Sequence, residues 1–376
     1  MKDPRVEKLA RYLLTRAVKV RRGELVYIES KGDLSRELTL ELVSIVSELG
    51  GMPVMFDFSG EFMRRMLLNM DEAQIRTFAA FHLGIMKQAD AFISVRGDNH
   101  AFPLSDVPDD KRAMWQTHFW KPVHIEERVN NTRWCVVRYP NNSMADGAGM
   151  AQEPFSDFYF NACLTNYERM SKAMDPLVAL MDRTDKVRIV GPGTDISFSI
   201  KGIPAIKCDG EKNVPDGEVY TAPVSGSMNG TITYNVPSMN DGELFTGVCY
   251  VVKNGKIVKA TCAGGDEAHL NQLHDVDEGA REFGEFAIAV NPCITDPMKD
   301  ILFDEKIRGS FHLTPGQAYE NADNGNESKM HWDQVQIQTP AYGGGEIWFD
   351  GVLVRKDGIF VLPELEGLNP EALTAS

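Results

Sequence analysis

Alternation of strand-like and helix-like segments in the first half of the chain limits the folds open to it. Residues 4–19 and 71–88 carry apolar side chains at helical spacing. Short apolar runs of strand length occupy 25–28, 54–56 and 91–95. Strands and helices that alternate in this way predict a parallel sheet covered by helices. We therefore expect a Rossmann-like α/β domain with a mostly parallel sheet over residues 1–185.

The pattern changes after this point. The apolar runs become short and are separated by Gly, Asn, Asp and Pro, with one helix expected near 266–282. Asp350-Gly351 and Asp357-Gly358 have the sequence of hairpin turns between short strands. Residues 186–376 are therefore predicted to form an α+β, β-rich second domain.

A Rossmann-like sheet does not by itself imply that the protein binds a dinucleotide. The turn after the first strand, Ser30-Lys31-Gly32-Asp33, lacks the Gly-x-Gly-x-x-Gly fingerprint. Gly191-Pro192-Gly193 resembles a phosphate loop only superficially, because an alternating strand pattern follows it at 196–200. We interpret it as a turn.

The charge and the cysteine pattern of the chain argue against several other classes of protein. The net charge of -15, without a long run of Lys and Arg, disfavours nucleic-acid binding. The N-terminus lacks the apolar core of a signal peptide, and no apolar run reaches the length of a membrane span. The six cysteines form no Cys-x-x-Cys pair, and several lie in apolar runs. We therefore predict that the thiols are buried and free and that the protein is located in the cytoplasm.

The segment Lys329–Gln338 carries the first chemical signal. Read as a strand, it places His331 and Asp333 on the same face as Val335 and Ile337. A carboxylate on an inward face needs a partner, and a metal ion would supply one. Taken alone, however, the segment fits better a hydrogen-bonded His–Asp pair at the edge of a core.

Further potential ligands lie nearby in the sequence. His312 sits in a short apolar run, Glu305 ends another, and Glu285 directly precedes the apolar run 286–290. Together with His331 and Asp333 they form a cluster suited to Zn, Co or Mn, or to Fe(II) in another geometry. The remaining histidines lack a comparable acidic cluster and are assigned structural or surface roles: His82, His100, His118, His124, His269 and His274.

Several blocks of sequence resemble the thermophilic-type metalloaminopeptidase family (aminopeptidase T-like and aminopeptidase S-like enzymes). The blocks that carry candidate ligands are Asn213–Pro223 with Glu218, Phe283-Gly284-Glu285, Phe303-Asp304-Glu305 with His312 and Tyr319, and Asn326-x-Ser328-x-x-His331-x-Asp333. Further similar stretches are Trp134-Cys135, Met150-Ala151-Gln152, Asp157–Phe160, Phe349-Asp350-Gly351 and Arg355–Gly358. The resemblance thus covers most of the chain.

The resemblance implies a metal-dependent aminopeptidase that removes the N-terminal residue from short peptides through a water activated by two metals. It implies two divalent cations per chain (Zn, Co or Mn) and a homodimer. The ligands it implies are Glu218, Glu285, Glu305, His312, His331 and Asp333, with Glu285 bridging the two cations. We expect the Tyr319 hydroxyl to stabilise the tetrahedral intermediate. Glu218 is also a candidate general base, although the resemblance makes it a ligand.

Two alternatives remain open. A mononuclear Fe(II) ring-opening dioxygenase could use His312, His331 and Asp333 as its triad. Such an enzyme has no use for Glu218, Glu285 and Glu305 together, and this favours the peptidase. A non-catalytic peptide-binding protein with a structural metal is the other alternative.

Overall fold

The computed structural model describes residues 3–100, 102–240 and 242–375. It divides into two compact units. The first consists of 1–164 and 210–214, and the second of 165–209 and 215–376. The predicted boundary near residue 185 differs from this division, since α9 (Tyr167–Arg183) packs on strands of the second unit.

The first unit is an α/β layer structure. In its described part, five strands form a parallel sheet of order β2-β1-β3-β4-β8. The strands are β1 (Leu25–Lys31), β2 (Met52–Asp57), β3 (Ala91–Arg96), β4 (Arg133–Arg138) and β8 (Asn213–Val214). This confirms the parallel, helix-covered sheet expected from the sequence.

The helices of the first unit connect these strands. They are α1 (Pro4–Tyr12), α2 (Arg36–Glu48), α3 (Gly60–Asn69), α4 (Glu72–Met86), α5 (Asp109–Trp115), α6 (Val129–Asn131), α7 (Asn142–Ala148) and α8 (Gln152–Cys163). Three further segments are the π-helical η1 (Leu13–Ala17) and η3 (Gln116–Arg128) and the 3-10 turn η2 (Asp33–Ser35). In place of one helix over 4–19, α1 continues as η1.

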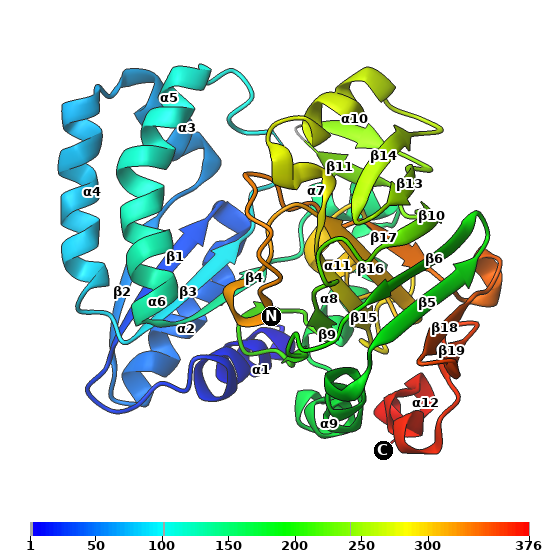
Figure 1. The fold of residues 1–376 in the computed structure, drawn as a ribbon. Helices are drawn as coiled ribbons and strands as arrows, with labels where there is room; N and C mark the ends of the chain where they lie inside the picture. Colours follow the sequence, from blue (N-terminus) through cyan, green and yellow to red (C-terminus); the bar gives the residue numbers. More distant parts are fainter. Residues whose placement is uncertain (1–2, 101, 241, 376) are drawn as a thin grey trace. The chain divides into compact units, whose positions relative to one another are not determined.

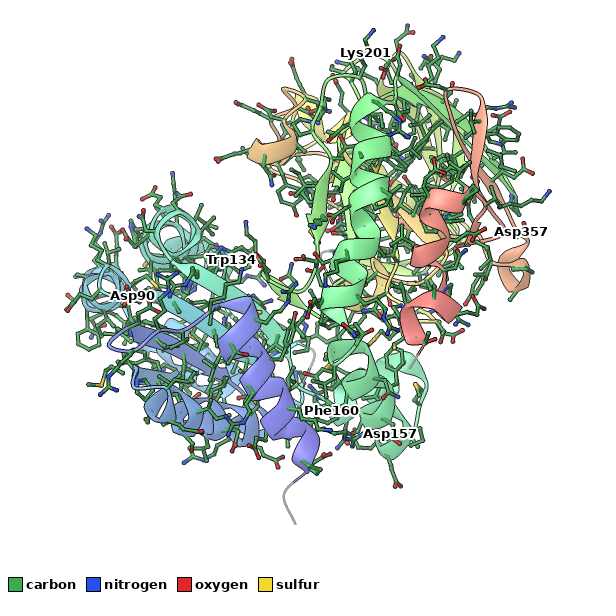
Figure 2. The ribbon with its side chains drawn as sticks, turned by 90° about the horizontal axis from the view of Figure 1, so that it is seen from below. Asp90, Trp134, Asp157, Phe160, Lys201 and Asp357 are labelled. Atoms are coloured by element: carbon green, nitrogen blue, oxygen red, sulfur yellow. The ribbon has the colours of Figure 1, made fainter. Side chains whose placement is uncertain are left out.

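Apolar faces of these helices make the core. Side chains of α3, α4 and η3 pack with Tyr27 of β1 and Phe92 of β3 in one buried cluster. Arg5 of α1 binds Asp157 and lies 4.4 Å from the Phe160 ring. Asp157 and Phe160, labelled in Figure 2, both lie on α8, so Arg5 ties the two helices together.

The second unit contains two larger antiparallel sheets, as drawn in Figure 1. Within its described residues, one sheet has the order β14-β13-β10-β6-β5-β18-β19-β20 and the other β17-β16-β15-β9-β7. A small third sheet pairs β11 with β12. The strands are β5 (Lys186–Gly191), β6 (Thr194–Ser199), β7 (Ile206–Cys208), β9 (Glu218–Thr221), β10 (Asn229–Thr233), β11 (Ser238–Asn240), β12 (Glu243–Phe245), β13 (Cys249–Lys253), β14 (Lys256–Thr261), β15 (Phe283–Ala289), β16 (Ser310–Pro315), β17 (Val335–Ile337), β18 (Glu346–Phe349), β19 (Val352–Lys356) and β20 (Ile359–Phe360).

Helices in the second unit are few and short apart from α9. They are α10 (Glu267–His274), α11 (Ile301–Asp304), α12 (Pro370–Thr374) and the 3-10 segments η4 (Glu278–Arg281), η5 (Glu320–Ala322), η6 (Pro340–Tyr342) and η7 (Pro363–Leu368). The helix predicted near 266–282 is therefore split into α10 and η4. The β-rich character predicted for this part of the chain is confirmed.

Turn chemistry was predicted correctly. Asp350-Gly351 joins β18 to β19 and Asp357-Gly358 joins β19 to β20, with φ of 50° at both aspartates and 82° at both glycines. Two consecutive positive φ angles match the twist of a two-residue hairpin, which Asp-Gly adopts readily. Gly191-Pro192-Gly193 is likewise the turn between β5 and β6.

Two further expectations concern the thiols and membranes. None of the six cysteines forms a disulfide within the described ranges; Cys135 and Cys163 are buried and the other four are half-buried. No helix among the described residues is long and apolar enough to cross a membrane.

Candidate metal centre

Three neighbouring strands of the second unit supply the first group of candidate ligands. Figure 1 shows β9, β15 and β16 side by side, and they carry Glu218, Glu285 and His312 respectively. Glu218 lies opposite Ala289, and His312 lies opposite Ala287. Alternation along β15 puts Glu285 on the same face as these two alanines. Their small side chains leave space between the two glutamates and the histidine.

Glu285 lies inside its strand, not before it. Apolar residues 286–290 suggested an acid at the strand's mouth, but β15 begins at Phe283 and Glu285 is only 3% exposed. A carboxylate this deep is costly unless cationic groups surround it. The two carboxylate oxygens serve different partners: Oε1 lies 3.5 Å from His312 Nε2, and Oε2 lies 3.3 Å from His331 Nε2.

His331 and Asp333 come from the segment before β17. The predicted strand over 329–338 is wrong in extent, since only Val335–Ile337 is a strand. His331 instead forms an isolated bridge with Gly316, whose φ is +103°. A Cβ at Gly316 would lie 2.0 Å from the Met330 carbonyl oxygen. Glycine therefore allows the close approach that brings His331 to the site.

The burial of the second face of this segment was not predicted. The residues at the alternate positions of this segment are all buried: Trp332, Gln334, Gln336 and Gln338. They pack into the unit and make hydrogen bonds, such as Trp332 Nε1 to Ser238 Oγ at 2.7 Å. Both sides of the segment are thus covered, while His331 and Asp333 retain 22% and 14% exposure.

The His331 ring is held in one orientation. Its Nδ1 lies 2.8 Å from the Gln317 carbonyl oxygen, so Nδ1–H donates and Nε2 is left to face Asp333 and Glu285. Asp333 is fixed in turn, because the Thr314 hydroxyl donates to Asp333 Oδ1 at 2.7 Å. Metal-binding histidines typically donate their second N–H to a carbonyl in this way.

Unsatisfied buried atoms test whether a cation fits. Glu218 Oε2 and His331 Nε2 are buried without a hydrogen-bond partner among the described residues. His312 Nδ1 is also buried and lacks one. Such groups are costly to leave unpaired. Carboxylate oxygens with imidazole nitrogens are a donor set that Zn, Co and Mn accept, so the residues fit a divalent metal.

The candidate ligands fall into two groups that share one residue. Glu218, Glu285 and His312 offer ligand atoms that all lie within 4.8 Å of one another, as do Glu285, His331 and Asp333. Glu285 therefore belongs to both groups. The combination of His312, His331 and Asp333, which the dioxygenase alternative requires, is not such a group within the described residues.

The electrostatics follow from burial and from this pairing. Although burial opposes it, Asp333 and Glu285 raise the pKa of His331 to about 12, and Glu218 and Glu285 raise that of His312 to about 9. Burial raises the pKa of Glu218, whereas the two histidines lower that of Glu285 against the effect of burial. Without a metal, the histidines carry the positive charge that the carboxylates require.

A buried lysine beside these ligands was missed at the sequence level. Lys306 is 1% exposed, and its ammonium contacts Glu218 and lies 3.0 Å from Glu305 Oε1 and 3.5 Å from Asp216 Oδ1. The surrounding carboxylates raise its pKa well above the usual value despite burial. The only sequence signal was the adjacency of Glu305 and Lys306 after an apolar run, which exposed ion pairs share.

Glu305 and Tyr319 stand apart from the two groups. Glu305 caps the C-terminus of α11 and is paired with Lys306, and burial raises the pKa of its carboxyl to about 8. The Tyr319 ring lies 4.8 Å from the His331 ring and is 46% exposed. Both residues lie beside the proposed ligands. Glu305 belongs to no group of mutually close ligand atoms in the described ranges.

Comparisons with known proteins identify the family to which the chain is similar. A model of the thermophilic metalloprotease family M29 matches residues 2–343. The chain is 30% identical over 321 residues to aminopeptidase T of Thermus aquaticus, covering 73% of this chain and 74% of that protein. It is 24% identical over 355 residues to aminopeptidase PepS of Streptococcus thermophilus, covering 84% of each.

A solved structure shares the fold. Wild-type AmpT from Thermus thermophilus matches with a TM-score of 0.79 and 22% sequence identity, over 95% of this chain and 99% of that chain. This likeness confirms the α/β plus β-rich architecture. None of the relatives named here is an oxygenase.

Proposed function

The chain belongs to the thermophilic metalloprotease family M29, a family of hydrolases, and we propose that it removes the N-terminal residue of short peptides with a two-metal centre. The observation that carries the proposal is the position of Glu285. One oxygen of this carboxylate faces His312 and the other faces His331, so a single residue serves both groups of candidate ligands. A shared carboxylate is what a pair of neighbouring cations requires.

Each residue of the donor set has a proposed role. Glu218 and His312 would hold one cation, His331 and Asp333 the other, and Glu285 both. When bound, divalent cations such as Zn, Co or Mn supply a water nucleophile at neutral pH and polarise the scissile carbonyl. Thr314 and the Gln317 carbonyl keep Asp333 and His331 in the orientation that metal binding needs.

The ligand chemistry of the site favours a peptide with a free N-terminus. Five carboxylates converge on the site, and Lys306 is the ammonium among them: Asp216, Glu218, Glu285, Glu305 and Asp333. Two divalent cations and Lys306 would balance these five carboxylates, so selection for a free N-terminus rests on the lone pair of the α-amine, which could serve as a further ligand and which an N-acetylated peptide does not offer. We expect the hydroxyl of Tyr319, whose ring lies 4.8 Å from that of His331, to donate to the carbonyl oxygen of the substrate.

Other parts of the proposal rest on the resemblance alone. Glu305 is proposed as a further ligand, although it is bound to Lys306 here. Glu218 stays a candidate general base as well as a ligand. The homodimer and the cytoplasmic location expected from the sequence stay predictions.

Substitution of Glu285 tests the proposal. Glu285→Gln removes the shared charge but keeps the shape, so we expect loss of leucyl-peptide hydrolysis together with loss of bound metal. Glu282→Gln is the matched control, because Glu282 lies just before the same strand and pairs with the exposed Lys256 at 3.4 Å. Hydrolysis by Glu285→Gln at a rate near that of the control would refute the shared-ligand role.

A further inference from the structure

The two candidate cation positions that share Glu285 differ in how their other ligands are held. At the first, the Gln317 carbonyl accepts a hydrogen bond from His331 Nδ1 at 2.8 Å. The Thr314 hydroxyl donates to Asp333 Oδ1 at 2.7 Å. Both ligands of this position are therefore oriented before a cation arrives. Partners of this kind are typically worth about 10–100-fold in metal affinity.

The position formed by Glu218 and His312 lacks this support. His312 is 1% exposed, and its Nδ1 has no hydrogen-bond partner in the part of the chain that the structure describes. Its Nε2 faces the carboxylates, 3.7 Å from Glu218 Oε2 and 3.5 Å from Glu285 Oε1. Among the described residues, therefore, no acceptor fixes the ring or makes Nε2 a stronger metal ligand.

Lys306 adds a competing cation at this second position. Its ammonium contacts Glu218 Oε1 and lies 3.0 Å from Glu305 Oε1 and 3.5 Å from Asp216 Oδ1. Because Lys306 is only 1% exposed, solvent screens its charge little. A metal ion bound to Glu218 has to share the carboxylate with this ammonium. It also has to approach a like charge in buried surroundings, where repulsion is stronger than at the surface.

A third group of possible ligand atoms lies around the same ammonium. Cys208, Asp216 and Glu218 offer atoms that all lie within 4.8 Å of one another. The Lys306 ammonium pairs with both carboxylates of this group, and its charge also acts on the Cys208 thiol. An internal cation therefore already balances this group, and Glu218 belongs both to it and to the second metal position.

The position of His331 and Asp333 has no such competitor within the described residues. The ion pairs of these two residues are with each other and with Glu285. They also retain 22% and 14% exposure, so a cation reaches them from solvent more readily than it reaches His312. Charge, orientation and access thus favour the same position.

We propose that the two cation positions differ in affinity, with the position of His331 and Asp333 filled first and the position of Glu218 and His312 weakened by Lys306. The inference rests on the proposed two-metal function and adds the order in which the metals bind. Lys306 is then a positioning residue, which holds Glu218 when metal is absent. Both positions fill when metal is in excess, and Lys306 sets the metal concentration at which the second cation binds.

A zinc titration of the chelator-stripped protein, with a chromophoric chelator as competitor, tests the order of binding. Two cations that share a carboxylate repel each other, so unequal steps alone do not decide the question. One variant at each position does. His312→Gln should remove the weaker step and leave the tighter one, whereas Asp333→Asn should remove the tighter step and leave only weak binding. The opposite assignment overturns the proposal, as does loss of the same step in both variants.

Replacement of Lys306 tests the cause of the difference. In Lys306→Met the weaker step should tighten by at least about tenfold, because the metal no longer competes with the ammonium for Glu218, and the tighter step should change much less. Lys306→Arg keeps the charge and should keep the weaker step weak. Lys172→Met removes a charge from the exposed pair with Glu168 and should change neither step. A weaker step that does not tighten in Lys306→Met overturns the role of Lys306.

Circular dichroism of each stripped variant shows whether it is folded before the titration. Lys306→Gln keeps two N–H donors for the carboxylates without the charge, so it replaces Lys306→Met if that variant is unfolded. The same tightening is expected, and its absence has the same meaning.

Peptide hydrolysis measured along the titration separates this inference from the proposed function. Two unequal steps in the predicted order, without hydrolysis of an unblocked leucyl peptide, would overturn the function and leave the order standing. Hydrolysis with the two steps in the reverse order would overturn the order alone. A protein that binds only one zinc ion at any concentration would overturn both.

Discussion

Replacement of Lys306 by methionine should destabilise the metal-free protein by about 4 kcal/mol. The ammonium of Lys306 is 1% exposed and compensates Glu218, Glu305 and Asp216. Methionine fills a similar volume but leaves one uncompensated negative charge among them. Removing one partner of a buried ion pair typically lowers the free energy of unfolding by about 3–5 kcal/mol.

Urea denaturation at pH 7.5 measures this loss. The protein is first stripped with a chelator, and free energies of unfolding are compared between wild type and Lys306→Met. Lys172→Met is the matched control, because Lys172 pairs with Glu168 on the exposed surface of α9 and its removal should change stability little.

Measuring the same unfolding free energies in the metal-loaded protein tests whether metal ions can replace the positive charge of Lys306. Divalent cations bring positive charge to the same carboxylates, so the loss in the loaded protein should be smaller than in the stripped protein. A stripped Lys306→Met protein that loses less than about 1 kcal/mol would refute the reasoning, since the carboxylates would then not depend on Lys306.

Three further predictions follow from the structure. Thr314→Val should weaken metal binding about 10–100-fold in a metal titration, because the hydroxyl that orients Asp333 is lost; unchanged affinity would contradict this. Gly316→Ala should lower metal content and peptide hydrolysis together, since its Cβ would meet the Met330 carbonyl oxygen at 2.0 Å; the measurement is metal content after purification. His274 is buried, with Nδ1–H donating to the Ala280 carbonyl and Nε2 accepting from the Tyr250 hydroxyl, and burial lowers its pKa to about 4. Its contribution to stability should be complete above about pH 6.5 and fall as pH drops toward 4, by about 2 kcal/mol at pH 5. His274→Gln should flatten this part of the pH–stability curve, and an unchanged slope would argue against the assignment.

Much of the fold could be predicted from the sequence because its signals are local. Helical periodicity, short apolar strands and Asp-Gly turns each depend on neighbouring residues, and the parallel sheet and both hairpins were predicted correctly. The extent of the segment around His331 was wrong. Its backbone departs from a strand at the bridge with Gly316, a contact between residues fifteen apart that periodicity does not encode.

The candidate site was predictable only in part for the same reason. Acidic and histidine residues could be recognised by type, and Glu218, Glu285, His312, His331 and Asp333 do converge. Lys306 could not be recognised, since only the fold shows that it is buried among carboxylates.

The metal content of the purified protein, measured by mass spectrometry together with peptide hydrolysis, tests the central claim most directly. The two groups of ligands that share Glu285 predict about two divalent metals per chain and cleavage of an unblocked leucyl peptide but not of its N-acetylated form. Removal of the metals with a chelator should abolish the cleavage, and their return should restore it. One iron per chain with no cleavage of either peptide would contradict the account.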